Sequence, residues 1–408
     1  MNNISTNSRK KRTLFVCDLM YTPDVLENGA ILCEGENILA IGGISSFDLE
    51  DNIEVYFFEN AYATPGFVDI HIHGAGGFDS SAVLESPKSL NDMSLVLANR
   101  GITSFVPTVV SDQHDKMLNN LSELAKVIRQ GCQGAEPIGI NVEGPFLHPK
   151  KCGAQDISAI VPIDLGYAKE LIAAGDGLIK LMTFAPGLDN AVDLVELLCM
   201  NNIVPSMGHS IASEEKTIRA IDAGASHCTH LFNGMPTLHQ RDMSITNVVL
   251  TDNRVTVELI IDGRHIDPRM VDLACRCKPD DRLIGISDCT MAAGMSNGEY
   301  RIGPTKIIVE NGYTSTDGKI LAGTTTMLDA GWHCLMGYGH LAPSQAARAV
   351  TSNAAKSIGF SDRGFLRPRL LADIAFFERN THKPLMTVTR GGIVYDAKTN
   401  YRIKGVEA

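Results

Sequence analysis

Short apolar segments alternate with segments of helical length along most of this chain. Eight runs rich in aliphatic and β-branched residues span residues 63–73, 101–110, 137–144, 178–186, 203–210, 224–231, 255–262 and 282–288. A polar or amphipathic stretch follows each run, as in parallel strands joined by helices. Eight such repeats favour a (β/α)8 TIM-like barrel. A doubly wound open sheet is the alternative, although the GxGxxG turn that usually follows its first strand is absent.

The stretches between the runs carry the spacing of amphipathic helices. Apolar residues recur at helical intervals in residues 89–100, 114–130, 189–202 and 213–224. Ser213 can cap the start of the last stretch, and Gly224 can end it. We therefore expect helices over these four segments.

Both ends of the chain differ from its middle. Residues 12–62 and 370–399 read as hairpins with Gly and Asn turns, without a helix-length amphipathic run. We expect a small β-sandwich domain built from residues 1–62 and 366–408, beside a barrel at 63–365. Residues 298–322 read as a β insertion after the eighth barrel strand.

Composition excludes several classes of partner. The chain has 36 Lys and Arg against 47 Asp and Glu, a net charge of −11, whereas nucleic-acid binding needs a basic face. No segment approaches the roughly 18 apolar residues that span a membrane. The basic N-terminus precedes too short an apolar run for a signal peptide. The ten cysteines are scattered without a CxxC pair, so we expect reduced thiols in a cytoplasmic protein.

Ionisable residues close most of the apolar runs, and chemistry in a barrel lies at the C-terminal ends of its strands. A single His there is more often structural, and a single Asp or Glu is more often a helix N-cap. Together, however, these residues would meet at one mouth and favour a metal hydrolase site. They are His71, His73, Glu143, His209, His230, Asp262 and Asp288. His227 stands three residues before His230, so strand parity predicts that it faces the other way and is structural.

The segments around these residues resemble one family. They are PGFVDIHIHGAGG, NVEGPFLHPKKCGAQD, MGHS, THLFNGMPTLHQRD, IIDGRHIDP, ISDCTMAAGM and LAGTTT. In this order they are similar to the signature segments of the N-acetylglucosamine-6-phosphate deacetylase family, a branch of the amidohydrolase superfamily that includes N-acetylgalactosamine-6-phosphate deacetylases. The resemblance runs from about residue 60 to residue 380, and it implies an amidohydrolase-type barrel.

The resemblance also implies roles for individual residues. Glu143, His209 and His230 match metal ligands, and His71 and His73 match the ligands of members that hold a second metal. Asp288 matches the catalytic acid and base and is also counted among the metal ligands. The resemblance further implies one or two divalent cations per subunit. Zn, Fe, Mn and Co are all compatible with these ligands. The matching substrate-binding positions are Ala154, Gln155, Asn233, Gly234, Arg241, Asp262, Gly263, Arg264, His265, Leu321, Ala322 and Gly323.

Four positions depart from the family pattern, and we expect all of them around the pocket. Gln155 stands where the family has a His, and it can donate a hydrogen bond but cannot become cationic. Asp242-Met243-Ser244 replaces the usual turn after Arg241, Cys289 replaces Ala, and His333-Cys334 replaces Arg-Asn. Arg241 and His265 match phosphate contacts, which a homodimer could supply across its interface.

These observations predict a metal-dependent hydrolase that converts N-acetylglucosamine-6-phosphate to glucosamine-6-phosphate and acetate. Its partner would be a small-molecule amino sugar phosphate. We expect it to bind neither nucleic acid nor a membrane. One alternative is an N-acetylgalactosamine-6-phosphate deacetylase, and another is a related amidohydrolase that acts on an unphosphorylated or differently acylated amine. A third is a non-catalytic sensor of an amino sugar phosphate, although such a protein would not need Asp288.

Overall fold

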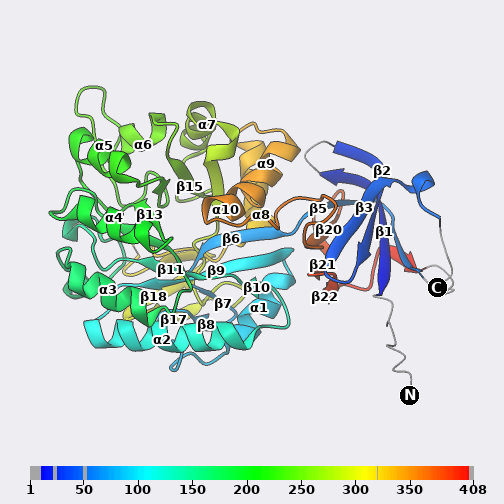
Figure 1. Cartoon of the computed structure of the whole chain (residues 1–408), viewed down its shortest axis with the longest axis horizontal. Coiled ribbons are helices and arrows are strands. Elements are labelled where there is room, and N and C mark those ends of the chain that lie inside the picture. The colour runs from blue at the N-terminus through cyan, green and yellow to red at the C-terminus, as the bar shows by residue number, and fades with distance from the viewer. Residues whose placement is uncertain (1–10, 22–24, 49–52, 319, 404–408) are drawn as a thin grey trace, which may run out of the picture.

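The computed structural model describes residues 11–21, 25–48, 53–318 and 320–403. Eight parallel strands form a nearly closed barrel, with helices packed around its outside (Figure 1). The strands are β6 (Phe67–Ile72), β9 (Ile102–Val110), β11 (Ile140–Glu143), β12 (Ile179–Phe184), β13 (Val204–Met207), β14 (His227–Cys228), β15 (Thr256–Ile260) and β16 (Leu283–Ile286). The Asp288 amide donates to the His71 carbonyl at 3.0 Å and joins the last strand end to the first. The predicted barrel is therefore confirmed, and the alternative of a doubly wound open sheet is wrong.

Seven helices follow the first seven barrel strands, and three follow the last. The first seven are α1 (Leu90–Ala98), α2 (His114–Gln130), α3 (Leu165–Ala174), α4 (Ala191–Met200), α5 (Glu214–Ala223), α6 (Ile245–Thr251) and α7 (Pro268–Cys277). The last three are α8 (Leu328–Gly337), α9 (Pro343–Ala349) and α10 (Ser352–Ser357). All four predicted helices are confirmed within two residues of their bounds. Ser213 caps α5 by accepting from the Lys216 amide, and Gly224 ends it at φ +123°.

The predicted strand over residues 224–231 is much shorter in the structure. Only His227 and Cys228 pair as β14, and a turn begins immediately afterwards. His230 and Phe232 adopt positive φ angles of 26° and 78°, a conformation that an extended strand cannot contain. The strand therefore ends early, and the alternation of faces does not reach His230.

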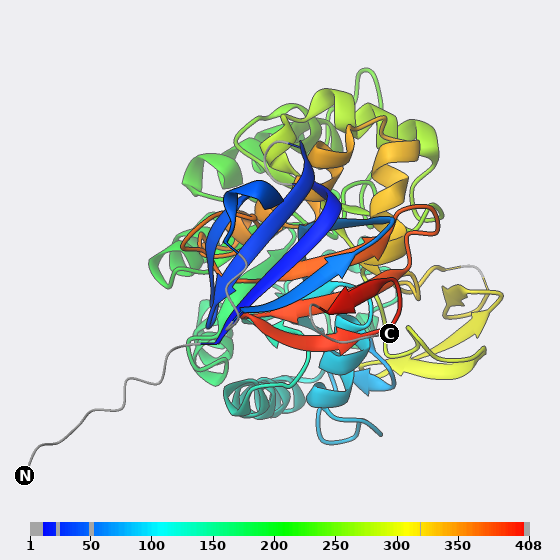
Figure 2. The same ribbon diagram turned by 90° about the vertical axis from the view of Figure 1, so that its right-hand side faces the viewer.

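Strands from both ends of the chain form one sheet beside the barrel (Figure 2). They are β1 (Arg12–Tyr21), β2 (Val25–Glu34), β3 (Asn37–Gly43), β4 (Ile53–Phe58), β5 (Ala61–Pro65), β20 (Ile374–Glu378), β21 (Pro384–Thr389), β22 (Gly392–Asp396) and β23 (Tyr401–Ile403). β5 pairs with β1 on one side and with β20 on the other. The separate β domain is therefore present, while its boundaries at residues 62 and 365 stay predictions. Residues 1–10 and 404–408 lie outside the described residues.

The segment after the barrel forms the expected β insertion. β17 (Gly298–Ile302), β18 (Thr305–Glu310) and β19 (Tyr313–Ser315) make an antiparallel sheet. A separate two-stranded sheet pairs β7 (Gly74–Ala75) with β8 (Phe78–Asp79). β10 (Glu136–Pro137) extends the barrel sheet beside β9. Short 3-10 helices cover Ile44–Ser46, Pro149–Lys151, Ile157–Ala159 and Asp280–Arg282. Among the described residues, no helix has both the length and the apolar composition needed to cross a lipid bilayer.

Candidate active site and metal centre

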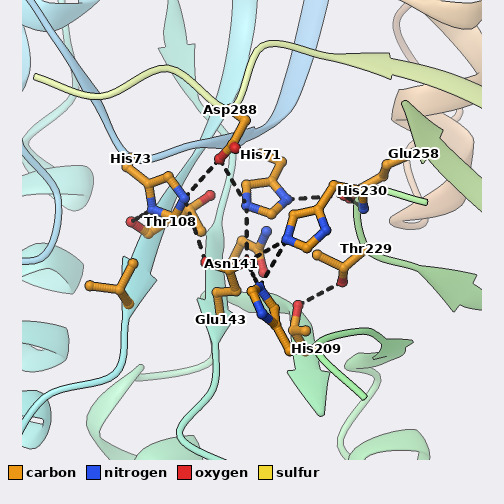
Figure 3. Close-up of polar contacts among 12 residues, drawn as sticks. His71, His73, Thr108, Asn141, Glu143, His209, Thr229, His230, Glu258 and Asp288 are labelled. Atoms are coloured by element: carbon orange, nitrogen blue, oxygen red, sulfur yellow. Dashed lines mark hydrogen bonds and ion pairs between the residues drawn. The ribbon is translucent and has the colours of Figure 1, made fainter. Parts of the chain in front are cut away.

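Six ionisable side chains meet at the mouth of the barrel (Figure 3). All six are buried: His71, His73, Glu143, His209, His230 and Asp288. Each comes from the C-terminal end of a strand or from the first residues after it, on β6, β11, β13, β14 and β16. This is the edge at which barrel enzymes place their chemistry. The structure thus brings together side chains that lie more than 200 residues apart in the sequence.

The six side chains divide into two groups with metal-ligand spacing. In the first, Asp288 Oδ1 lies 3.0 Å from His73 Nε2 and 3.6 Å from His71 Nε2. In the second, Glu143 Oε1 lies 2.9 Å from Nε2 of both His209 and His230. Each group offers imidazole and carboxylate donors, which zinc and similar divalent cations prefer.

The carboxylate of Glu143 faces both groups. Besides its contacts in the second group, its Oε1 lies 3.7 Å from His71 Nε2, and its Oε2 lies 3.5 Å from His73 Nε2. A carboxylate in this position could act as a ligand for a cation in either group. The geometry therefore fits either one cation in the second group or two cations that share Glu143.

The outer ring nitrogens of three histidines are held by acceptors. His73 Nδ1 faces the Thr108 carbonyl at 3.3 Å, His209 Nδ1 faces the Lys151 carbonyl at 2.6 Å, and His71 Nδ1 faces the Glu258 carboxylate at 3.0 Å. An acceptor there keeps the proton on Nδ1 and leaves the lone pair of Nε2 for a metal. His71 Nε2 is buried without a hydrogen-bond partner. The donor set therefore fits a divalent cation.

Electrostatics keep the two carboxylates at the mouth ionised. Burial opposes their charge, but His209 and His230 hold the pKa of Glu143 well below its ordinary value. His73 and His71 likewise lower the pKa of Asp288 against the effect of burial. Both groups are therefore in the anionic form that binds cations, and Asp288 can accept a proton.

Three of these residues have left-handed backbone conformations. The φ angles are +43° at His209, +26° at His230 and +51° at Asp288. Such angles are unfavourable for residues with a Cβ and cluster at functional sites. At each position the backbone turns as its strand ends, so the side chain is directed over the barrel mouth (Figure 3).

A pocket opens directly above the metal-ligand groups. Eight of the twelve predicted substrate-binding residues line it: Ala154, Gln155, Asn233, Gly234, His265, Leu321, Ala322 and Gly323. The other four do not. Arg241 is exposed, Arg264 stacks on Tyr313 at 3.9 Å, and Asp262 lies behind His265, with Oδ2 2.7 Å from its Nδ1. Gly263 faces Tyr338, the residue that follows α8.

Of the four departures from the family pattern, only Gln155 lies in the pocket. Its Nε2 donates to Glu143 Oε2 at 2.9 Å, and its Oε1 accepts from the Ser111 amide and hydroxyl at 3.0 and 2.6 Å. Cys289 is buried against Thr324, and the His333 ring packs at a tilt against His382 of the small β domain, with ring centroids 4.1 Å apart. The expectation that all four departures surround the pocket is therefore wrong.

Glu258 is a site residue that sequence reasoning missed. It lies within β15, is fully buried, and accepts hydrogen bonds from His71, His227 and the His230 amide. His227 thus points toward the site, contrary to the prediction from parity, because β14 ends before His230. The available signal was a charged residue in the interior of the apolar run 255–262, in addition to Asp262 at its end.

A parallel barrel with these residues at its strand ends defines the class of metal-dependent amidohydrolases. The family model described as "Amidohydrolase family" matches residues 62–400. The N-acetylglucosamine-6-phosphate deacetylase of Bacillus subtilis (strain 168) is 32% identical over 366 residues, which cover 88% of this chain and 92% of that protein. The N-acetylgalactosamine-6-phosphate deacetylase of Escherichia coli O157:H7 is 29% identical over 319 residues, which cover 78% and 84%.

Solved structures agree with these relatives. The crystal structure of N-acetyl-D-glucosamine-6-phosphate deacetylase from Mycobacterium smegmatis matches with a TM-score of 0.87 at 28% identity, covering 94% of this chain and all of that one. The enzyme of the same name from Thermotoga maritima matches with a TM-score of 0.81 at 26% identity, covering 93% and 98%. The chain therefore belongs to the amidohydrolase family, and within it to the N-acetylglucosamine-6-phosphate deacetylases. It is a hydrolase.

Proposed function

We propose that the chain hydrolyses the acetamide of N-acetylglucosamine-6-phosphate and releases acetate and glucosamine-6-phosphate. One observation carries the proposal: Asp288 belongs to one of two adjacent metal-ligand groups and also lines the pocket above them. This arrangement serves hydrolysis of a poor electrophile such as an amide. The substrate is suggested by the relatives from B. subtilis and M. smegmatis, which are deacetylases of this sugar phosphate.

We assign one divalent cation to Glu143, His209 and His230 and a second to His71, His73 and Asp288. Zn, Fe, Mn and Co all accept such a mixture of imidazole and carboxylate. A cation in this site supplies Lewis acidity, which acidifies water and polarises an amide carbonyl. Glu143, whose carboxylate faces both groups, could contribute a ligand to either cation.

Asp288 moves the proton in this proposal. Its carboxylate accepts the proton that water loses as the water oxygen attacks the carbonyl carbon. The same carboxylate then donates that proton to the amide nitrogen as the C–N bond breaks, so that the sugar leaves as a neutral amine. The two transfers return Asp288 to its ionised form.

The walls of the pocket provide groups for the sugar and its phosphate. We assign Asn233, Gly234 and the turn Leu321–Gly323 to the sugar, and His265 to the phosphate. Asp262 favours the cationic form of His265, whose pKa it raises against the effect of burial. Arg241 is exposed outside its own pocket. We propose that a homodimer brings this guanidinium to the pocket of its partner copy.

Two alternatives rest on particular observations. The galacto epimer is favoured by the E. coli relative, which is an N-acetylgalactosamine-6-phosphate deacetylase. An unphosphorylated substrate is favoured because neither Arg241 nor Arg264 lines the pocket.

We also propose a cytoplasmic location, which is consistent with ten cysteines that are all unpaired thiols.

The test is acetate release by purified protein whose metal content has been measured. The substrates are N-acetylglucosamine-6-phosphate, N-acetylgalactosamine-6-phosphate and unphosphorylated N-acetylglucosamine. We expect fast release from the first, slower release from the second and little from the third. Release from none, with metal bound, would exclude this substrate class. A fully folded chain that binds no metal would favour the non-catalytic sensor instead.

A further inference from the structure

We propose that Glu258 is a positioning residue that holds one member of each metal-ligand group in place. Glu258 lies in the middle of β15, and none of its side chain is exposed. A buried carboxylate is costly unless hydrogen bonds compensate its charge. Its partners therefore identify what this residue is for.

Three N–H groups converge on this carboxylate. Oε2 accepts from the His230 backbone amide at 3.1 Å and faces His71 Nδ1 at 3.0 Å, while Oε1 faces His227 Nε2 at 3.0 Å. The backbone amide can only donate, so Oε2 is an acceptor there. With both rings donating as well, three N–H groups compensate the charge of the carboxylate.

The contact with His71 determines how this ring meets a cation. Once Nδ1 carries the proton that is shared with Glu258, only Nε2 has a free lone pair. Nε2 has no hydrogen-bond partner and faces Asp288 Oδ1 at 3.6 Å and Glu143 Oε1 at 3.7 Å. Glu258 thus sets both the tautomer and the orientation of a first-group ligand.

The contact with His230 links the same carboxylate to the second group. The His230 backbone has a φ angle of +26°, a strained conformation that needs support from its surroundings. The hydrogen bond from its amide to Glu258 Oε2 provides that support. His227 completes the arrangement, because its Nε2 faces the other oxygen of Glu258 at 3.0 Å. Figure 3 shows Glu258 beside His71 and His230.

The inference rests on the proposed metal centre but not on the identity of the sugar. The test variant is Glu258→Gln, which keeps the shape of the side chain but replaces one acceptor oxygen by a donor. Thr229→Val is the matched control: Thr229 is also buried inside the barrel, bonds to Thr183 and Ser206 at 2.8 and 2.6 Å, and touches no ligand side chain. The readouts are cations bound per chain, Co²⁺ affinity and the Co²⁺ absorption spectrum.

We expect wild type and Thr229→Val to bind two cations per chain. Glu258→Gln should bind the cation at His71, His73 and Asp288 about 10–100-fold more weakly, because a neutral amide is a weaker acceptor for His71 Nδ1 than a carboxylate. The cation at Glu143, His209 and His230 should be weakened by a smaller factor, because only the backbone support of His230 is changed. Equal binding of both cations by Glu258→Gln and wild type would overturn the inference alone. A wild-type chain that binds no divalent cation would overturn it together with the metal centre.

A cycle with His71→Ala tests whether Glu258 acts through this ligand. If it does, Glu258→Gln should cause no further loss of affinity at the first group when His71 is already absent. Full additivity of the two losses would contradict the mechanism. Should Glu258→Gln fail to fold, ¹⁵N spectra of the wild-type imidazoles decide: we expect His71 protonated at Nδ1 and bound to metal through Nε2. A His71 ring that is protonated at Nε2 and bound to metal through Nδ1 would overturn the positioning role of Glu258.

Discussion

Asp288 combines the properties that a proton-transfer group needs: it is ionised, it lies beside His71 and His73, and it borders the pocket. Replacing it by Asn removes the basic oxygen while keeping the size of the side chain. We expect Asp288→Asn to retain its fold and the cation of the second group and to lose about 10²–10⁴-fold in kcat. Steady-state acetate release, with metal content and Tm as controls, measures this. More than a tenth of wild-type activity would remove Asp288 from the role.

Gln155 is bound on both sides of its amide, so we expect it to act on Glu143 rather than on the sugar. Gln155→Leu keeps the volume but removes the hydrogen bonds to Glu143 and Ser111. We expect lower kcat and weaker metal binding with little change in KM. Ser111→Ala, which removes the hydroxyl donor to the Gln155 amide oxygen but keeps the backbone donor, should show a smaller effect in the same direction. An increase in KM with unchanged metal affinity would assign Gln155 to the substrate instead.

The pair Asp262 and His265 predicts a pH dependence. His265 has a raised pKa, because Asp262 outweighs burial, so the imidazolium is present at low pH and is lost as pH rises through that raised pKa. If His265 binds phosphate, KM for the phosphorylated sugar should rise over this interval. Asp262→Asn removes the stabilising charge, so the rise in KM should move to lower pH. Identical KM profiles for variant and wild type would contradict the assignment.

Single residues were predictable from the sequence where a local pattern marked them. Each of the six mouth residues is ionisable and ends an apolar run, which a single sequence displays. Glu258 lies inside an apolar run instead of ending it. Its role could not be predicted, because its partners His71 and His230 lie 187 and 28 residues away and only the closed barrel brings them together. The orientation of Gln155 depends in the same way on Ser111, 44 residues away.

At the scale of elements, the strand ends predict an unusual order of stability. His209 follows β13 with a φ angle of +43°, which costs a residue with a Cβ about 1–2 kcal/mol but costs Gly little. We therefore expect His209→Gly to be more stable than His209→Ala by about 1 kcal/mol. Urea unfolding in chelator measures both variants without metal. Ser206, inside β13, is the control, where Gly should be less stable than Ala. If the Ala variant were more stable than the Gly variant at both positions, the result would contradict the prediction.

The same backbone turns explain which elements could be predicted. The helices at 89–100 and 114–130 follow from the periodicity of their apolar residues, which is local. The strand at 224–231 was predicted too long, because its apolar residues continue beyond the point at which pairing stops. Nothing in the local sequence shows that His230 and Phe232 adopt positive φ, since that depends on contacts such as the one between the His230 amide and Glu258.

At the scale of the whole molecule, the two parts share a core. Tyr62 on β5 and Phe377 on β20 belong to the small β domain but pack in the same apolar cluster as Phe67 on β6. β5 is also separated from β6, which carries His71, by Gly66 alone. Trp332 on α8 joins this cluster, with ring centroids 6.0 Å from Tyr62 and 5.8 Å from Phe67. The sequence predicted both domains but not this shared packing, because no local pattern records which apolar faces meet.

This shared core predicts that the barrel and the small domain unfold together. Trp332 is the only tryptophan of the chain, so its fluorescence reports on the junction, whereas far-UV circular dichroism reports on all helices and strands. We expect both signals to change at the same denaturant concentration. Tyr62→Ala should lower the free energy of unfolding by about 3–5 kcal/mol, because it leaves a large cavity at the junction. Both midpoints should therefore move by the same amount to lower denaturant concentration. Phe58→Ala, which unstacks Phe376 inside the small domain, should also shift both. A fluorescence change that precedes the loss of helix would show that the domains separate before the barrel unfolds.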